Sequence, residues 1–225
     1  MDWSGFALAL VAFFATHTVP VRTPIKPYLV RKLGQKGYSA LYGLVSLAVL
    51  AWVIVAAGRA PFVPLWGWAP WQPWLALGLM LLASLLFSLS VARPNPFSFG
   101  GVRNDQFDPA EPGPIRLTRH PILAVLALWS GAHVLANGDL ARVIVFGLFF
   151  VFAVFGGRLI DRRKRREMGP DWQALWGEVA RQPLLASGWR DAKFTRRLGI
   201  GVGFWLLMLV LHPLVIGVSP LPPLP

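Results

Sequence analysis

The stretch Tyr38–Ala57, YSALYGLVSLAVLAWVIVAA, has twenty consecutive residues without a charge or a proline. A helix rises about 1.5 Å per residue, so this stretch covers about 30 Å, the thickness of the hydrocarbon core of a bilayer. Backbone polar groups find no water in lipid and must pair within the segment, which a helix achieves. The stretch therefore predicts a transmembrane helix.

Other apolar runs of similar length accompany this one. They lie at about 3–20, 73–92, 118–136, 140–160 and 198–218. The chain is 55% hydrophobic and 14% charged, whereas soluble domains carry about 25% charged residues. The runs are too long and too unalternating for barrel strands. We predict an all-α, polytopic membrane bundle of about six transmembrane helices, forming one membrane domain over residues 1–225.

The positive charges of the chain are distributed unevenly between the predicted loops. The net charge is +12, and 20 of the 22 Lys and Arg residues fall in the segments 21–37, 93–119 and 158–197. Basic residues accumulate in cytoplasmic loops of membrane proteins. The pattern predicts a multi-pass protein of the inner (cytoplasmic) membrane with both termini on the non-cytoplasmic side. Topology explains the charge, and nucleic acid is not expected as a partner.

A short segment after the fifth span has helical spacing of large apolar residues. These are Trp172, Leu175, Trp176 and Val179. Together with the basic residues before it, this segment predicts an amphipathic helix on the membrane surface.

The four histidines lie in, or at the edges of, the apolar runs: they are His17, His120, His133 and His212. The ten carboxylates fall outside these runs or at their ends, and the chain has no cysteine. An ionisable residue at membrane depth is costly and indicates function. Histidine without a carboxylate partner favours metal ligation over proton transfer. In lipid, two imidazoles and a large apolar pocket favour heme iron.

The string GPIRLTRHP at Gly113–Pro121 precedes the fourth span. Thr118 is expected to cap the helix, with Pro121 in its first turn. Arg119 and His120 then lie at the cytoplasmic interface. They either hold the helix end or face an anion such as a cofactor propionate, and we favour the second interpretation.

His133 lies thirteen residues after His120, which is about 20 Å further along a helix. In a purely structural role, the His133 ring would form a hydrogen bond with a neighbouring backbone carbonyl or with Asp139. By depth in the membrane, His17 matches His120, whereas His133 matches His212.

Several motifs together closely resemble the NnrU-domain family over nearly the whole chain. They are GPIRLTRHP at 113–121, LW at 128–129, AHVLANGD at 132–139, the stretches Phe14–His17 and Arg93–Phe97, and Asp161-Arg-Arg. The Arg-His-Pro element alone is unspecific, because isoprenylcysteine and phospholipid methyltransferases also use one.

The resemblance implies two roles. Bacterial members are associated with denitrification, through the expression or activity of nitric oxide reductase. Another branch is the 15-cis-zeta-carotene isomerase, a membrane enzyme with heme b. Its two important histidines look similar to His17 and His133. That branch has a cysteine three residues before the second histidine, where this chain has Ser130, so a switch to a thiolate ligand is not expected here.

The resemblance therefore implies heme b, with His17 and His133 as metal ligands. The depth match makes His120 a further candidate, and the place of His120 and Arg119 at the interface predicts that both bind the cofactor. The iron would act on a lipophilic or gaseous ligand, as in a heme-dependent isomerase. A second interpretation is an assembly or regulatory partner of a respiratory nitric oxide reductase, without chemistry of its own. A third, a methyltransferase, is disfavoured because only Asp161 and Glu167 stand where such enzymes have adjacent glutamates.

The topology predicts the result of a reporter fusion. A reporter fused after Pro225 should be active outside the cytoplasm, because the three basic segments hold the opposite ends of the spans inside. A matched fusion in the basic segment 158–197 should be active inside. Activity of the C-terminal fusion in the cytoplasm alone would refute the predicted orientation.

Overall fold

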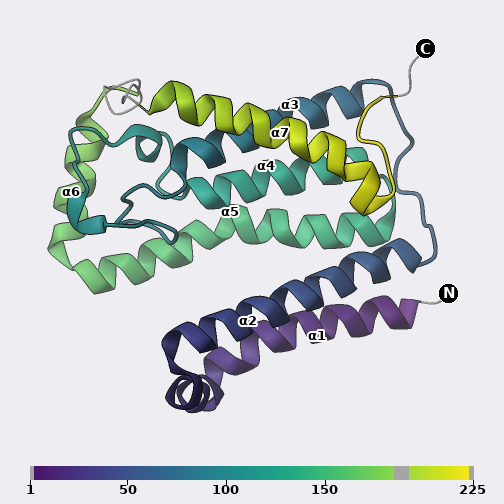
Figure 1. Ribbon diagram of the computed structural model, residues 1–225, viewed down its shortest axis with the longest axis horizontal. Coiled ribbons are helices and arrows are strands. Elements are labelled where there is room, and N and C mark those ends of the chain that lie inside the picture. The colour runs from purple at the N-terminus through teal and green to yellow at the C-terminus, as the bar shows by residue number, and fades with distance from the viewer. Residues whose placement is uncertain (1–2, 185–192, 223–225) are drawn as a thin grey trace. The chain divides into compact units, whose positions relative to one another are not determined.

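The computed structural model describes residues 3–184 and 193–222 and is all helical in this part of the chain, as predicted (Figure 1). The α-helices are α1 (Trp3–Arg22), α2 (Ile25–Arg59), α3 (Trp71–Ser90), α4 (Pro121–Ala136), α5 (Leu140–Met168), α6 (Pro170–Arg181) and α7 (Phe194–Ile216). Two short 3-10 helices, η1 (Asn104–Gln106) and η2 (Gly113–Arg116), lie between α3 and α4.

Five of these helices, α1, α2, α3, α5 and α7, are long and apolar enough to cross a membrane. Large apolar side chains remain exposed on them, as Leu207, Val210 and Leu214 do on α7. Such a surface suits lipid rather than water, so the chain is a multi-pass membrane protein. Helix α4 has 16 residues, or about 24 Å, and falls short of the hydrocarbon thickness. The sixth span and the orientation stay predictions.

The chain forms two compact units. Unit 1 contains Met1–Gly67 and Gly138–Val145, and unit 2 contains Trp68–Asn137 and Phe146–Pro225. Helix α5 therefore begins in unit 1 and continues in unit 2. The single membrane domain that the sequence predicts is not tested by this division.

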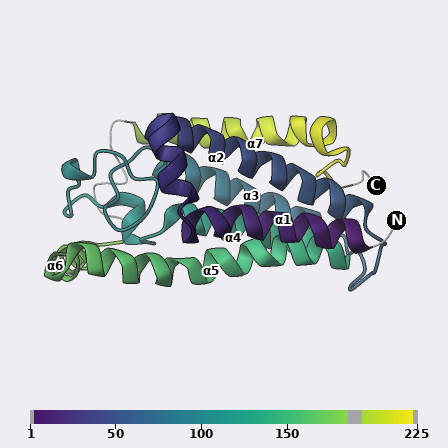
Figure 2. The ribbon, with the colours of Figure 1, turned by 90° about the horizontal axis from the view of Figure 1, so that it is seen from below.

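Unit 1 is built on the antiparallel hairpin of α1 and α2 (Figures 1 and 2). Helix α2 starts at Ile25, well before the predicted Tyr38, so much of the expected loop 21–37 is helical. Gly34 has φ 71° and ψ 168°, a left-handed conformation that glycine adopts without strain. The first part of α2 consequently stands at an angle to the remainder (Figure 2). The sequence missed this segment because its lysines and arginines interrupt the apolar pattern.

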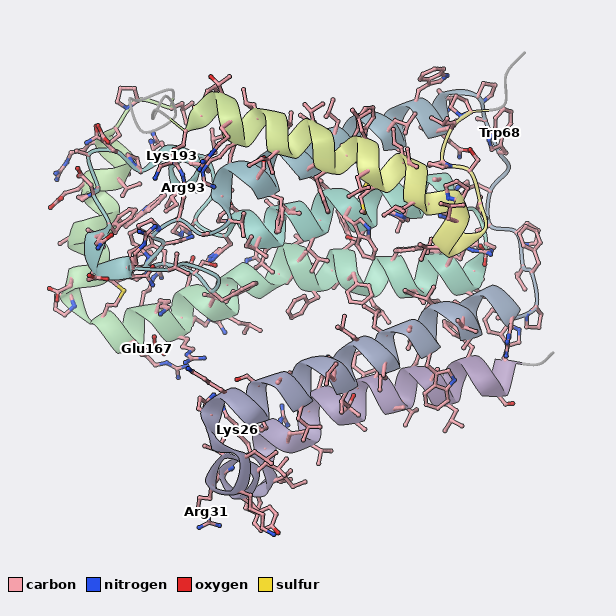
Figure 3. All side chains as sticks on the ribbon, in the orientation of Figure 1. Lys26, Arg31, Trp68, Arg93, Glu167 and Lys193 are labelled. Carbon is pink, nitrogen blue, oxygen red and sulfur yellow. The ribbon has the colours of Figure 1, made fainter. Side chains whose placement is uncertain are left out.

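Unit 2 contains α3, α4, α6, α7 and most of α5. Helix α3 packs against α4 and α7, and α4 contacts α5 where the Trp129 ring meets the rings of Phe146 and Phe149. Figure 3 shows Arg93 and Lys193 at one end of this unit and Trp68 at the other. The separation of basic and aromatic ends agrees with the charge pattern that the sequence displays.

Helix α6 confirms the amphipathic helix expected around Trp172. Its apolar face packs on the protein itself, because Trp172 and Val179 join a buried cluster with Phe97 and Ile115. The loop between α3 and α4 supplies the last two residues. The helix thus covers this loop with the face that was expected to contact lipid.

Substitution of Gly201 should separate α7 from α3. A Cβ at this position would lie 2.6 Å from Ser88 Oγ and 3.1 Å from Leu85 Cα, and overpacking of this kind costs about 1–3 kcal/mol. We expect Gly201→Ala to lower the thermal unfolding midpoint of the detergent-purified protein. The control is Gly203→Ala in the same helix, where no atom lies within 4 Å of the added Cβ. Equal midpoints for the two variants would contradict the close packing.

Candidate functional site

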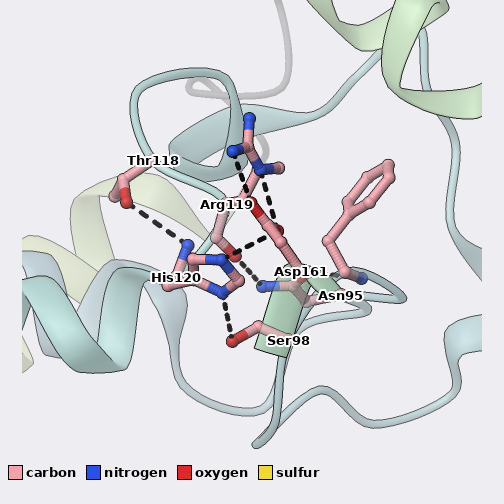
Figure 4. Close-up of polar contacts among 7 residues, drawn as sticks. Asn95, Ser98, Thr118, Arg119, His120 and Asp161 are labelled. Carbon is pink, nitrogen blue, oxygen red and sulfur yellow. Dashed lines mark hydrogen bonds and ion pairs between the residues drawn. The ribbon is translucent and has the colours of Figure 1, made fainter. Parts of the chain in front are cut away.

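The Asp161 carboxylate of α5 is the centre of a buried polar network in unit 2 (Figure 4). Arg119 Nη2 donates to Asp161 Oδ2 at 2.7 Å, and Arg119 Nε donates to Oδ1 at 3.2 Å. His120 Nε2 lies 3.0 Å from Asp161 Oδ1. The two consecutive residues before α4 therefore bind one carboxylate, and Arg119 does so with both oxygens, in the geometry that makes charge-assisted pairs strong.

The hydrogen bonds of His120 define its tautomer. A carboxylate only accepts, so His120 Nε2 carries a proton, and Nδ1 accepts from the Ser98 hydroxyl at 3.0 Å. Burial lowers the pKa of His120 below its ordinary value of 6.5; the Asp161 carboxylate opposes this shift, and the Arg119 charge adds to it. The ring is therefore neutral near pH 7, and the Arg119 and Asp161 charges cancel.

The network also holds the loop after α3. Asn95 Nδ2 donates to the Arg119 carbonyl at 3.0 Å, and Asn95 Oδ1 accepts from Phe97 N at 3.1 Å. Phe97 is fully buried and packs edge-on against Trp172 and Trp176 of α6. One set of hydrogen bonds thus joins the loop, the start of α4 and the end of α5.

Two further features fix this arrangement. The Arg119 guanidinium carbon lies 4.5 Å from the ring centre of Trp176 and 5.6 Å from that of Trp172, which are cation–π distances. Gly157 on α5 lets the His120 ring approach, because a Cβ there would lie 2.7 Å from His120 Cδ2. The close contact between His120 and α5 therefore requires a residue without a Cβ at position 157.

The network corrects two predictions. His120 does have a carboxylate partner, Asp161, which the sequence pattern does not reveal because the two residues are 41 positions apart. Arg119 and His120 both face this internal carboxylate, and their predicted role at a cofactor propionate stays a prediction. Thr118 does not cap α4: the residue that precedes the helix is His120, whose backbone N–H donates to Thr118 Oγ1 at 3.3 Å. Pro121 occupies the first turn as expected.

The other three histidines share one hydrogen-bond pattern. In each, Nδ1 lies close to a backbone carbonyl: 2.7 Å from Phe13 O for His17, 2.7 Å from Trp129 O for His133, and 2.6 Å from Val218 O for His212. A carbonyl only accepts, so Nδ1 is protonated and, in the neutral ring, Nε2 carries the lone pair. For His133, the Trp129 carbonyl is the neighbouring acceptor that a purely structural role predicts.

The structure brings His133 and His212 together within unit 2. Their ring centres are 6.5 Å apart, and their planes are inclined by 30°. The match in depth predicted for this pair is thereby confirmed. The aromatic rings of Trp129 and Phe146 also contact the His133 ring, with centres at 4.9 and 4.6 Å.

His17 belongs to unit 1, where its ring contacts Phe13 and Tyr42. Its pairing with His133 stays a prediction. In the part of the chain that the structure describes, no three or more His, Cys, Asp or Glu side chains gather into a metal-binding group.

Ser130 occupies the position of the cysteine in the isomerase branch. Its side chain is fully buried, and Oγ donates to the Leu126 carbonyl at 2.6 Å. The hydroxyl is therefore satisfied by its own helix. The expectation that no switch to a thiolate ligand occurs at this position stays a prediction.

A family model described as NnrU protein matches residues 5–220. The chain belongs to the NnrU family. No curated protein matches the chain, and no solved structure does. The match confirms the resemblance that the motifs indicated. The family motifs quoted from the sequence supply the network: Arg119 and His120 come from GPIRLTRHP, Asn95 from RPNPF, and Asp161 from the Asp-Arg-Arg stretch.

Sequence reasoning noticed these motifs but did not connect them. The sequence patterns gave Asn95 only as part of the resemblance and assigned Asp161 no partner, and they did not indicate Ser98 at all. A carboxylate at the end of a long apolar run is the one signal that points to Asp161, because such a group requires a partner. Ser98 lies in a loop without periodicity and gives no comparable signal.

Loss of the Asp161 charge should destabilise the protein. Asp161→Asn leaves Arg119 without its anion and sets an amide N–H among donors, which should cost about 1–3 kcal/mol and lower the thermal unfolding midpoint in detergent. The control is Glu167→Gln on the same helix, whose partners Arg163 and Lys164 form an exposed cluster of a kind worth little. Equal effects of the two substitutions would show that the network does not hold the fold.

Proposed function

We propose that this NnrU-family membrane protein binds heme b and that His133 is a ligand of the iron. The observation that supports the proposal is the hydrogen bond from His133 Nδ1–H to the Trp129 carbonyl at 2.7 Å. Metal-ligating histidines typically donate their other ring N–H to a carboxylate or a backbone carbonyl, which fixes the tautomer and raises the basicity of the free nitrogen. His133 has this arrangement in an apolar helix.

The residues around His133 fit a heme in chemical terms. Imidazole is a common heme ligand, and Trp129, Phe146 and the apolar residues of α4 provide an environment without competing charge. Bound heme would supply one-electron chemistry and a site for a gaseous or lipophilic ligand. The contribution of the chain is to hold the His133 ring by its hydrogen bond to the Trp129 carbonyl and by tilted contacts with the Trp129 and Phe146 rings.

The Asp161 network has a different role in this proposal. Arg119 Nε, Arg119 Nη2 and His120 Nε2 all form hydrogen bonds with the Asp161 carboxylate inside the protein. We infer that these residues position α4 rather than bind a propionate. The same contacts argue against a methyltransferase, because the Arg-His-Pro element is occupied by an internal carboxylate.

The class of ligand follows from the family and is part of the proposal. Association with denitrification favours a gaseous ligand, and the isomerase branch favours a lipophilic one with a cis double bond. This chain has Ser130 where the isomerase branch has a cysteine, and a serine hydroxyl cannot replace a thiolate ligand, so the isomerase mechanism has less support. The alternative to heme chemistry is a partner protein of a nitric oxide reductase.

Purified protein should contain heme b. After expression with ample heme, the detergent-purified protein should show a Soret band and a pyridine hemochrome spectrum of the b type. The control is Ser130→Ala, which should keep the wild-type spectrum because the Ser130 hydroxyl binds only its own helix in the described contacts. Colourless, folded wild-type protein would refute heme binding and favour the assembly or regulatory role.

A further inference from the structure

The histidines of α4 and α7 form a pair that the described function does not account for. His133 is in the last turn of α4, and His212 precedes Pro213 in the last turns of α7. Their ring centres are 6.5 Å apart at an inclination of 30°. Both residues belong to unit 2, so the pair is formed within one compact part of the protein.

The chain holds both rings in the same chemical state. Nδ1 of His133 donates to the Trp129 carbonyl, and Nδ1 of His212 donates to the Val218 carbonyl. The second bond requires α7 to end between the two residues: Gly217, at φ 82°, turns the chain and bonds the Pro213 carbonyl through its own N–H at 3.1 Å. The turn returns Val218 to His212.

The remaining ring nitrogens are the reactive atoms of the pair. Neither Nε2 has a hydrogen-bond partner among the residues that the structure describes, and each carries a lone pair in the neutral ring. Two basic nitrogens on adjacent rings without a donor suit one electrophile that both can bind. Two imidazoles that each bind one metal through a ring nitrogen at about 2 Å would have ring centres roughly 5–6 Å apart. The observed distance of 6.5 Å is close to this separation.

We propose that His133 and His212 are the two protein ligands of a single metal centre. Resting on the proposed function, the metal is heme iron, and its second imidazole comes from α7. This assignment differs from the pairing of His133 with His17 that the resemblance implies. His17 has the same Nδ1 bond but lies in unit 1, where its described ring contacts are Phe13 and Tyr42.

The test compares single variants of the purified full-length protein by absorption and electron paramagnetic resonance spectra. Wild-type protein should show six-coordinate, low-spin iron. His212→Ala should lose the low-spin spectrum and show high-spin iron, and added imidazole should restore the low-spin form. His133→Ala should show the same loss. His17→Ala, the matched control, should keep the wild-type spectrum. An unchanged spectrum for His212→Ala, together with a loss for His17→Ala, would overturn the proposal.

A second substitution separates ligation from folding. His212→Met keeps a side chain of similar length and offers a thioether, which raises the reduction potential of heme when it replaces histidine. A higher potential with heme retained is expected for a ligand. An unchanged potential, with His212→Ala also unchanged, would exclude His212 from the centre.

Failure of the proposed function can be distinguished from failure of this inference. If wild-type protein contains no heme, Cu²⁺ and Zn²⁺ are titrated directly. Binding of one ion per chain that is lost in both His133→Ala and His212→Ala, but not in His17→Ala, would support the two-histidine centre while refuting heme. Wild-type protein that binds neither heme nor these ions would overturn both.

Discussion

The Asp161 carboxylate is the group on which the arrangement of unit 2 depends. A charge near the end of an apolar helix is costly unless it is paired and its hydrogen bonds are complete. Arg119 cancels the charge, and His120 occupies the remaining position on Oδ1. Because these two residues immediately precede α4, the requirement to satisfy one carboxylate also determines where α4 begins beside α5.

The same requirement extends outward from α5. The Arg119 carbonyl accepts from Asn95, and the Ser98 hydroxyl donates to His120. The loop that carries Asn95 and Ser98 also carries Phe97, which is buried against α6. The polar network and the apolar cluster therefore stabilise each other, since the loop cannot leave one without leaving the other. The contact of Arg119 with Trp176 joins the two directly.

The sequence predicted the helices wherever composition alone determines them. Tyr38–Ala57 has no charge, and 140–160 has only Arg142 and Arg158 near its ends, so that only a helix satisfies their backbone in lipid. It failed at Ile25–Lys36 and after Ile160, where the helices continue into basic residues that interrupt the apolar pattern. It also failed to pair His120 with Asp161, because 41 residues separate them and periodicity does not report tertiary contacts. Depth in the membrane succeeded for His133 and His212, since each lies near the same end of its span.

The four histidines consequently fall into two chemical classes, which the sequence could not distinguish. His120 uses both ring nitrogens within the protein, one on Asp161 and one on Ser98, and a saturated imidazole of this kind neither binds a metal nor exchanges a proton without breaking the network. His17, His133 and His212 each use Nδ1 on a backbone carbonyl and keep Nε2 as a lone pair. For His17 and His133 the carbonyl belongs to the same helix four residues earlier, whereas for His212 it belongs to the turn that follows α7. His120 is therefore held as part of the folded framework of unit 2, whereas the three histidines of the second class each keep one ring nitrogen outside the described hydrogen bonds.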